Sequence, residues 1–161
     1  MEWQLRRAVP ADRDFLFEIH RQALGPYIEQ TWGWDEDEQR AHFDAAFEGG
    51  VWQVILFCGR PVAMIRTTET ENRIYLDDIE IAPAFQRKGL DSAIVTWVIA
   101  QASAAGKATS LQVLRVNPAR RLYERLGFEG IGGDDVHVRM RRCPDAGRPV
   151  RTQSLTRKSN R

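Results

Sequence analysis

The sequence predicts a single α/β domain built on a mixed sheet that is mostly antiparallel and contains one parallel crossover. Strand-like apolar runs occupy residues 51–58, 62–68, 74–81 and 109–116. Turn sequences separate the first three runs, as in an antiparallel meander. A helical pattern separates the third run from the fourth, and a strand–helix–strand connection of this length predicts a parallel pair. The chain length of 161 residues fits one domain with one core.

The N-terminal part predicts a strand followed by two helices. We expect Gly25 and Pro26 to end the first helix, because proline breaks the helical hydrogen-bond ladder. Residues 27–34 would then form an aromatic loop. Asp35 and Glu38 have the spacing of a capping box and begin the second helix.

The third apolar run is the strand on which the rest of the domain is organised. Its apolar residues Leu76, Ile79 and Ile81 do not keep the two-residue alternation of a strand, because three positions separate the first two. A β-bulge near Asp77 and Asp78 would bring all three residues to one face. We therefore expect a bulge in this strand.

A short basic loop follows this strand and leads into a helix that ends near Gly106. Gly89 can adopt backbone angles that other residues avoid, so the amides of residues 87–90 can converge beside the unpaired N–H groups of the helix N-terminus. Arg87 and Lys88 add positive charge. The loop therefore predicts an anion site, and an ordinary strand-to-helix turn is the alternative.

A second informative stretch lies further along the chain. Asn117 is a good N-cap and Pro118 suits the first helical position. One helical face carries Ala119, Leu122, Tyr123 and Leu126. Gly127 ends this helix, and the last strands are expected to form a hairpin around residues 132–135.

Taken together, the two stretches resemble the GCN5-related N-acetyltransferase (GNAT) superfamily. Residues 83–90 are similar to its acyl-CoA loop, and residues 117–128 are similar to its Asn…Ala…Leu-Tyr…Gly-Phe signature. The resemblance covers residues 2–141 and implies a GNAT-like fold, with helices on both faces of the sheet. It also implies direct transfer of the acetyl group of acetyl-CoA to an amine in a ternary complex, without a metal. The alternative is a non-catalytic acyl-CoA-binding module that regulates or docks a partner.

The resemblance implies that the pantetheine arm of the cofactor enters a splay beside the central strand, while the basic loop wraps the pyrophosphate. The implied cofactor contacts are Ile79, Glu80, Ile81, Gln86, Arg87, Lys88, Gly89, Leu90, Asp91, Ser92, Asn117 and Tyr123. Asp91 departs from the family pattern, which has Gly or Ala at this position. A carboxylate beside a phosphate opposes binding, so we expect Asp91 to weaken the affinity for acetyl-CoA without abolishing it.

Acetyl transfer needs a neutral amine, stabilisation of an oxyanion and a proton for the departing thiolate. Tyr123 matches the family tyrosine that gives this proton, although it also fits a purely apolar helix face. The run that contains Asp77 and Asp78 is similar to the Tyr-Leu-Glu-Asp of polyamine-type members. Asp77 is thus the first candidate for the base and Asp78 the second, with solvated turn-side charges as the alternative. Glu80 or a water chain could also serve, whereas Gln112 cannot take a proton.

In this superfamily the acceptor usually contacts the loop between the first two helices, which corresponds here to residues 27–37. The candidate acceptor contacts are Tyr27, Trp32, Trp34 and Asp77. Aromatic rings and acidic side chains suit a cationic amine, partly through cation–π attraction. The resemblance thus implies a small amine or a peptide or protein amine as acceptor. The alternative is that the tryptophans anchor the core and the acids are solvated.

The charge is unevenly distributed, although the formal net charge is only +1. Residues 143–161 carry a net charge of +4, from five basic residues and one acidic residue, which leaves −3 for residues 1–142. A body of this charge does not favour nucleic-acid binding. We expect a domain at 1–142 and a disordered basic tail at 143–161.

The remaining composition argues against several classes of protein. Cys58 and Cys143 give no disulfide framework, and the histidines His20, His42 and His137 form no ligand pair and are interpreted as structural or solvated. No window approaches the roughly 20 apolar residues that a membrane helix needs, so we expect a cytoplasmic protein. A homodimer is compatible with the sequence, which does not fix the oligomeric state.

Overall fold

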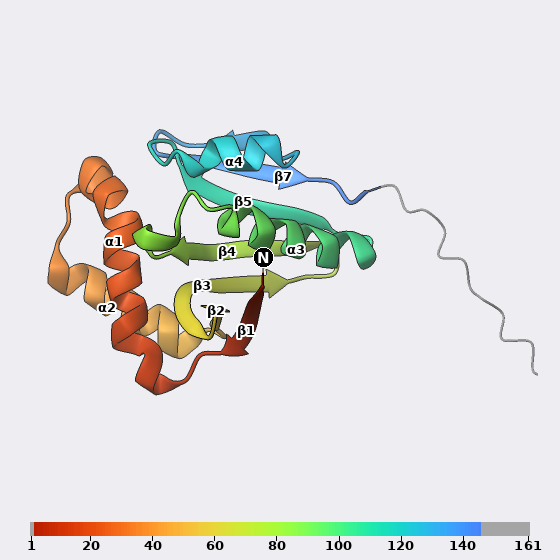
Figure 1. Cartoon of the computed structure of the whole chain (residues 1–161). Coiled ribbons are helices and arrows are strands. Elements are labelled where there is room, and N and C mark those ends of the chain that lie inside the picture. Colours follow the sequence, from red (N-terminus) through yellow and green to blue (C-terminus); the bar gives the residue numbers. More distant parts are fainter. Residues whose placement is uncertain (1, 146–161) are drawn as a thin grey trace, which may run out of the picture.

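The protein is described by a computed structural model that covers residues 2–145 (Figure 1). Within these residues, seven strands form one sheet in the order β1-β2-β3-β4-β5-β7-β6. The strands are β1 (Trp3–Arg7), β2 (Gln53–Phe57), β3 (Arg60–Glu69), β4 (Arg73–Ile81), β5 (Ala108–Leu114), β6 (Glu129–Gly133) and β7 (His137–Arg142). β4 and β5 pair in parallel, and the other neighbours in this sheet pair antiparallel. The predicted mixed sheet with one parallel crossover is confirmed.

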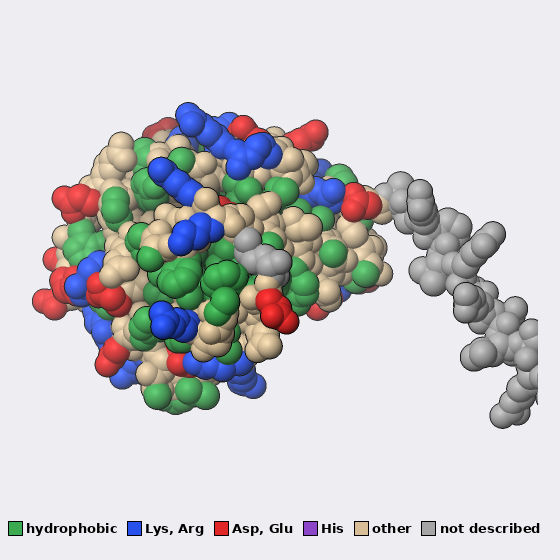
Figure 2. All heavy atoms as spheres, viewed as in Figure 1, with side chains coloured by type: hydrophobic (Ala, Val, Ile, Leu, Met, Phe, Trp, Pro, Cys, Tyr) green, Lys and Arg blue, Asp and Glu red, His purple; other side chains and the backbone are tan. Residues whose placement is uncertain are grey.

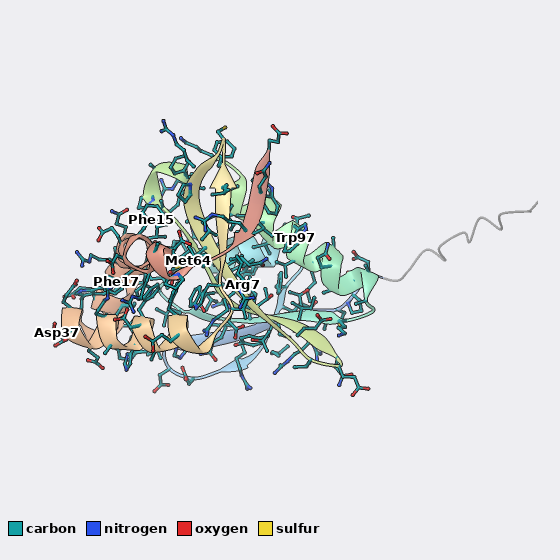
Figure 3. The ribbon with its side chains drawn as sticks, turned by 90° about the horizontal axis from the view of Figure 1, so that it is seen from below. Arg7, Phe15, Phe17, Asp37, Met64 and Trp97 are labelled. Carbon is teal, nitrogen blue, oxygen red and sulfur yellow. The ribbon has the colours of Figure 1, made fainter. Side chains whose placement is uncertain are left out.

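Helices cover both faces of the sheet. They are α1 (Arg13–Trp32), α2 (Glu36–Gly49), α3 (Leu90–Ala104) and α4 (Ala119–Arg125), with short 3-10 turns at Pro10–Asp12 and Pro83–Phe85. Alternation along the strands sends Val54 and Met64 toward α1 and α2, and Ile55 and Ile65 toward α3. Figure 3 shows Phe17 of α1 and Trp97 of α3 on opposite sides of the strands.

The prediction that Gly25 and Pro26 end the first helix is wrong. α1 continues to Trp32 with Pro26 inside it. Packing on both sides of the proline offsets the cost of its missing N–H. Ile28 is buried beyond the proline. Before it, Gly25 packs so close to Trp34 that a Cβ at this position would lie 3.6 Å from the indole ring. Most of the predicted loop at 27–34 is therefore helical.

Two predicted helix termini are confirmed, one of them with a shift. Asp35 caps α2, because its side chain accepts the N–H of Glu38 at 2.8 Å. Asn117 Oδ1 accepts the N–H of Ala119 at 2.9 Å and so caps α4, although Pro118 takes the cap position and the helix begins one residue later than predicted.

The predicted bulge in β4 is also confirmed. Arg66 of β3 pairs with Asp78, and the next residue pairs with Leu76, so Asp77 is the extra residue. After the bulge, Ile79 and Ile81 contact the core under α3. Glu80 then lies on the opposite face, where it reaches α1. The bulge thus sets which side chains of β4 meet α1.

The predicted tail falls largely outside the described residues, since residues 146–161 are not among them. The domain boundary at residue 142 stays a prediction. Within residues 2–145, no helix combines the length and the apolar character needed to cross a membrane.

Candidate functional site

A gap opens between β4 and β5 in the middle of the sheet (Figure 1). Their pairing ends at Leu76 and Leu111, although β4 continues to Ile81 and β5 to Leu114. The bulge at Asp77 directly follows the last paired residue, and a bulge bends and twists its strand. One edge of β4 is therefore without a strand partner from Asp77 onward, and such an edge can pair with an extended ligand.

Two cavities adjoin this gap. The acidic cavity, of about 300 Å³, is lined among others by Trp32, Tyr75, Asp77, Asp78, Gln112 and His137. The basic cavity, of about 320 Å³, is lined among others by Tyr27, Gln86, Arg87, Asp91, Arg121 and Arg125. Both linings include Leu24, Ile79, Glu80, Asn117 and Tyr123, so the two cavities meet at these residues.

The loop between β4 and α3 has the backbone geometry of an anion site. Gly89 has φ 81° and Arg87 has φ 57°, both in the left-handed region. We find no hydrogen-bond acceptor within residues 2–145 for the amides of residues 87–91. Gln86 ties the loop to the end of β4, because its Nε2 donates to the carbonyl of Ile81 at 2.8 Å. The amides beside the α3 N-terminus are thus available to a ligand.

The other predicted loop residues differ in what they contact. The side chain of Leu90 is buried in the core, whereas Lys88 is exposed and lies 5.7 Å from the centre of the Phe85 ring. Asp91 lines the basic cavity, and its Oδ1 accepts the N–H of Ser92 at 2.8 Å. One amide of the first turn of α3 is therefore already used, and Asp91 adds a carboxylate to a cavity that three arginines also line.

Three arginine side chains line the basic cavity. Arg121 and Arg125 line it from α4, and Arg87 lines it from the loop. On the face seen in Figure 2, Lys and Arg side chains gather over α4. This arrangement favours a ligand that carries phosphates.

Tyr123 lies at the junction of the two cavities. It is only 7% exposed and packs edge-to-face against Phe128, with 5.7 Å between ring centres. Burial, with a smaller contribution from the charge of Asp91, raises the pKa of the Tyr123 phenol well above its usual range. Tyr123 therefore keeps its proton at neutral pH and can donate it to a group that develops negative charge.

The two candidate bases both line the acidic cavity, and each has a neighbour on β3. Asp77 accepts the hydroxyl of Thr68 at 2.6 Å, and Asp78 accepts the Nε of Arg66 at 2.8 Å. Burial and the charge of Glu80 raise the pKa of Asp78 to about 6, against the opposing effect of Arg66. A carboxylate with such a pKa can take a proton near neutral pH.

Glu80 is held by a residue that the sequence does not single out. His20 Nδ1 lies 2.9 Å from Glu80 Oε1, and His20 Nε2 lies 3.2 Å from Gln39 Oε1. Burial lowers the pKa of His20, but the hydrogen bond and charge of Glu80 outweigh it, so the pKa is raised. The available signal is the four-residue spacing of Leu16, His20 and Leu24, which places the imidazole on the inner face of α1.

The predicted aromatic acceptor residues are not brought together. Trp32 lines the acidic cavity and lies 5.7 Å from the ring of His137, whereas Tyr27 lines the basic cavity. Trp34 lines neither cavity and packs against the rings of Phe17 and His20. Of the three, only Trp32 shares a cavity with Asp77 and Asp78. Within residues 2–145, no three acidic, histidine or cysteine side chains are grouped to hold a metal ion.

A free strand edge, an adjoining anion loop and a buried phenol form a site that suits an extended anionic ligand across the sheet. The family described as acetyltransferase (GNAT) family matches residues 13–128. The chain therefore belongs to the GNAT family of acetyltransferases. No match to a curated protein sequence is significant.

Solved structures share the fold at low sequence identity. PaiA N-acetyltransferase from Thermoplasma acidophilum, in complex with coenzyme A, has a TM-score of 0.71 at 14% identity, covering 89% of this chain and 99% of its own. The ribosomal-protein-S18-alanine N-acetyltransferase from Escherichia coli has a TM-score of 0.65 at 20% identity, covering 92% and 99%. YncA from Salmonella typhimurium with its cofactor acetyl-CoA has a TM-score of 0.57 at 21% identity, covering 92% and 97%. Identities in this range establish the fold alone.

Proposed function

We propose that the protein transfers the acetyl group of acetyl-CoA to a primary amine that enters through the acidic cavity, in a direct ternary complex. The observation that carries this proposal is the meeting of the basic and acidic cavities at Tyr123 and Asn117. A cofactor on one side and an amine on the other would then react beside a phenol that keeps its proton.

The basic cavity fits the cofactor. Free amides at residues 87–91 and the guanidinium groups of Arg87, Arg121 and Arg125 suit its phosphates. The unpaired edge of β4 at Ile79 and Ile81 suits the amide groups of the pantetheine arm, which can pair like a strand. Asp91 and Glu80 both line this cavity, and Asp91, at the first turn of α3, is the carboxylate beside the proposed phosphate site, where it predicts reduced affinity rather than a different ligand.

The acidic cavity supports a cationic acceptor. Three carboxylates line it, those of Asp77, Asp78 and Glu80. Trp32 adds an aromatic ring, and this residue is 59% exposed. Carboxylates and an aromatic face both attract an ammonium group. A volume of about 300 Å³ accommodates a small amine or the amino end of a peptide or protein chain. We therefore propose acceptors of these kinds.

The proposed chemistry divides the proton transfers between the two cavities. The ammonium form of the acceptor loses one proton to a carboxylate, and the neutral nitrogen then bonds to the thioester carbon. The carbon–sulfur bond breaks and the thiolate takes the proton of Tyr123, while the second proton leaves the nitrogen and returns to the Tyr123 phenolate, directly or through water. Asp78 is the proposed base, because its pKa of about 6 leaves it ionised and receptive near neutral pH, and Asp77 is the alternative. Tyr123 gives the proton to the sulfur.

The test measures CoA release from acetyl-CoA with a panel of spermidine, benzylamine and a short peptide with a free N-terminus. CoA is quantified by chromatography, because the exposed Cys58 and Cys143 would react with thiol dyes. Tyr123→Phe should lower kcat by about 10²- to 10⁴-fold while the calorimetric Kd for acetyl-CoA stays within about two-fold. Absence of turnover with every amine would refute the proposed acceptor class. Normal turnover by Tyr123→Phe would refute the role of the phenol.

A further inference from the structure

Glu80 carries a buried oxygen that no group in the described chain satisfies. The residue is 3% exposed, and its Oε2 has no hydrogen-bond partner, while it lines both cavities. An unpaired carboxylate oxygen away from bulk water costs free energy, and such groups in native proteins call for a partner. The oxygen therefore indicates a hydrogen-bond donor that arrives with a ligand.

The other oxygen of Glu80 is fixed from α1. His20 Nδ1 holds Oε1 at 2.9 Å, and the second ring nitrogen of His20 is held by Gln39 of α2. The imidazole also packs against the rings of Phe17, Trp34 and Phe43. Hydrogen bonds at both nitrogens and packing against three rings fix the orientation of His20, and His20 in turn fixes the carboxylate.

We propose that Glu80 Oε2 accepts a hydrogen bond from the reacting nitrogen of the acceptor amine, and that His20 is the positioning residue that aims this carboxylate. The proposal rests on the proposed function, because the acceptor is the amine of that reaction. It adds two residues to the proposed acceptor site: Glu80 of β4, beside Asp77 and Asp78, and His20 of α1. Glu80 thereby orients the nitrogen, while the proton itself leaves to Asp78.

The charges around Glu80 favour the acceptor over the cofactor as the source of this donor. A carboxylate binds an ammonium group more strongly than it binds the neutral amides of a pantetheine arm. Asp78 lies two residues before Glu80, on the same face of β4, and it lines the acidic cavity. An ammonium at the junction can therefore meet both carboxylates at once.

The pair of His20 and Glu80 also influences the pKa of Asp78. Three charged groups act on the pKa of Asp78: Glu80 and Asp77 on its own strand and Arg66 on β3. From α1, His20 hydrogen-bonds the carboxylate of Glu80. From α4, Tyr123 lines the same cavity as Asp78. A protonated His20 offsets the negative charge of Glu80. Removing the charge of Glu80 should therefore lower the pKa of Asp78, whereas removing the charge of His20 should raise it.

The experiment compares Glu80→Gln and His20→Asn with the wild type, using the best amine of the panel and the pH dependence of kcat/KM. Asn is chosen at position 20 because its amide N–H can replace Nδ1–H without a charge. Glu71→Gln in the β3–β4 turn and His42→Gln on the exposed side of α2 are the matched controls. Melting temperatures verify that each variant is folded, and calorimetry gives the Kd for acetyl-CoA.

Glu80→Gln should lower kcat/KM for the amine by about 10- to 100-fold, the loss expected for a charge-assisted hydrogen bond, with the Kd for acetyl-CoA unchanged. In Glu80→Gln, the midpoint of the acid limb of the kcat/KM profile should lie below the wild-type value near pH 6. In His20→Asn, this midpoint should lie above the wild-type value. If Glu80 and His20 had purely structural roles, the acid limbs of the two variants would move in the same direction or not at all. That result overturns the proposal. An equal loss of acetyl-CoA affinity in Glu80→Gln also overturns it, since the donor would then belong to the cofactor.

Two further outcomes keep this inference separate from the proposed function. A wild type that acetylates no amine refutes the proposed function itself. A wild type that turns over while Glu80→Gln behaves like Glu71→Gln refutes only the role of Glu80. If His20→Asn does not fold, the acid limb and the affinities of Glu80→Gln decide the matter alone.

Discussion

Leu76 and Leu111 form the last residue pair between β4 and β5, and the bulge at Asp77 begins at the next position of β4. The strand therefore leaves its parallel neighbour at the point where its acidic side chains begin. This coincidence places a free strand edge, two cavities and three carboxylates within one short stretch. The consequences of this arrangement can be measured one residue at a time.

Asp91→Asn should bind acetyl-CoA more tightly than the wild type. The change removes the carboxylate charge from the basic cavity and keeps a side-chain oxygen for the N–H of Ser92. At an effective dielectric typical of a protein surface, the gain is about 1 kcal/mol, or about five-fold in Kd. Calorimetric titration measures it, with Asp37→Asn on α2 as the control. Equal or weaker binding would show that Asp91 does not oppose the phosphates.

Asp78→Asn should remove the acid limb of the rate profile. In the wild type, kcat/KM for the amine should rise as the pH increases through about 6, because Asp78 must lose its proton before it can accept one from the amine. Below that pH, the protonated carboxyl is inactive as a base. Asp77→Asn is the comparison, since Asp77 lines the same cavity. If Asp77→Asn loses the limb and Asp78→Asn keeps it, the base is Asp77.

Trp32→Ala should raise the KM for a cationic amine and leave the Kd for acetyl-CoA unchanged. The ring lies at the edge of the acidic cavity beside His137, where a cation–π contact at an exposed site contributes about 0.5–1 kcal/mol. The expected increase in KM is therefore about two- to five-fold. Steady-state kinetics at saturating acetyl-CoA provide the value. A change in kcat alone would argue against an acceptor contact.

Pro26→Ala should stabilise the protein. Pro26 lies inside α1 and is exposed, so alanine restores a helical N–H without filling a packed site. The expected gain in the free energy of unfolding is about 1–3 kcal/mol, reduced by the larger conformational freedom of the unfolded variant. Denaturant unfolding followed by circular dichroism measures it, and Gln30→Ala on the same helix should change little. A lower stability would mean that Pro26 stabilises the folded conformation of α1.

Local patterns predicted the features that depend on local chemistry. The broken alternation of Leu76, Ile79 and Ile81 was enough to predict the bulge, and the spacing of Asp35 and Glu38 was enough to predict the cap of α2. These patterns involve neighbouring residues, so the sequence alone contains the required information.

Features that depend on distant partners could not be predicted in this way. α1 passes through Pro26 because packing of Ile28 and Trp34 outweighs a local preference. His20 and Glu80 are separated by 60 positions, and only the packing of α1 across the bulged strand brings them together. The aromatic residues were expected on one loop, but the continued helix turns Tyr27 and Trp32 toward different cavities.

In the proposed complex, acetyl-CoA lies along the free edge of β4 and presents its thioester to Tyr123. A crystal structure of the 161-residue chain grown with acetyl-CoA locates the cofactor. We predict phosphates at the amides of residues 87–91, a pantetheine arm beside Ile79 and Ile81, and a sulfur within hydrogen-bond reach of the Tyr123 hydroxyl. A cofactor bound elsewhere, or a sulfur pointing away from the acidic cavity, would refute this mode of binding.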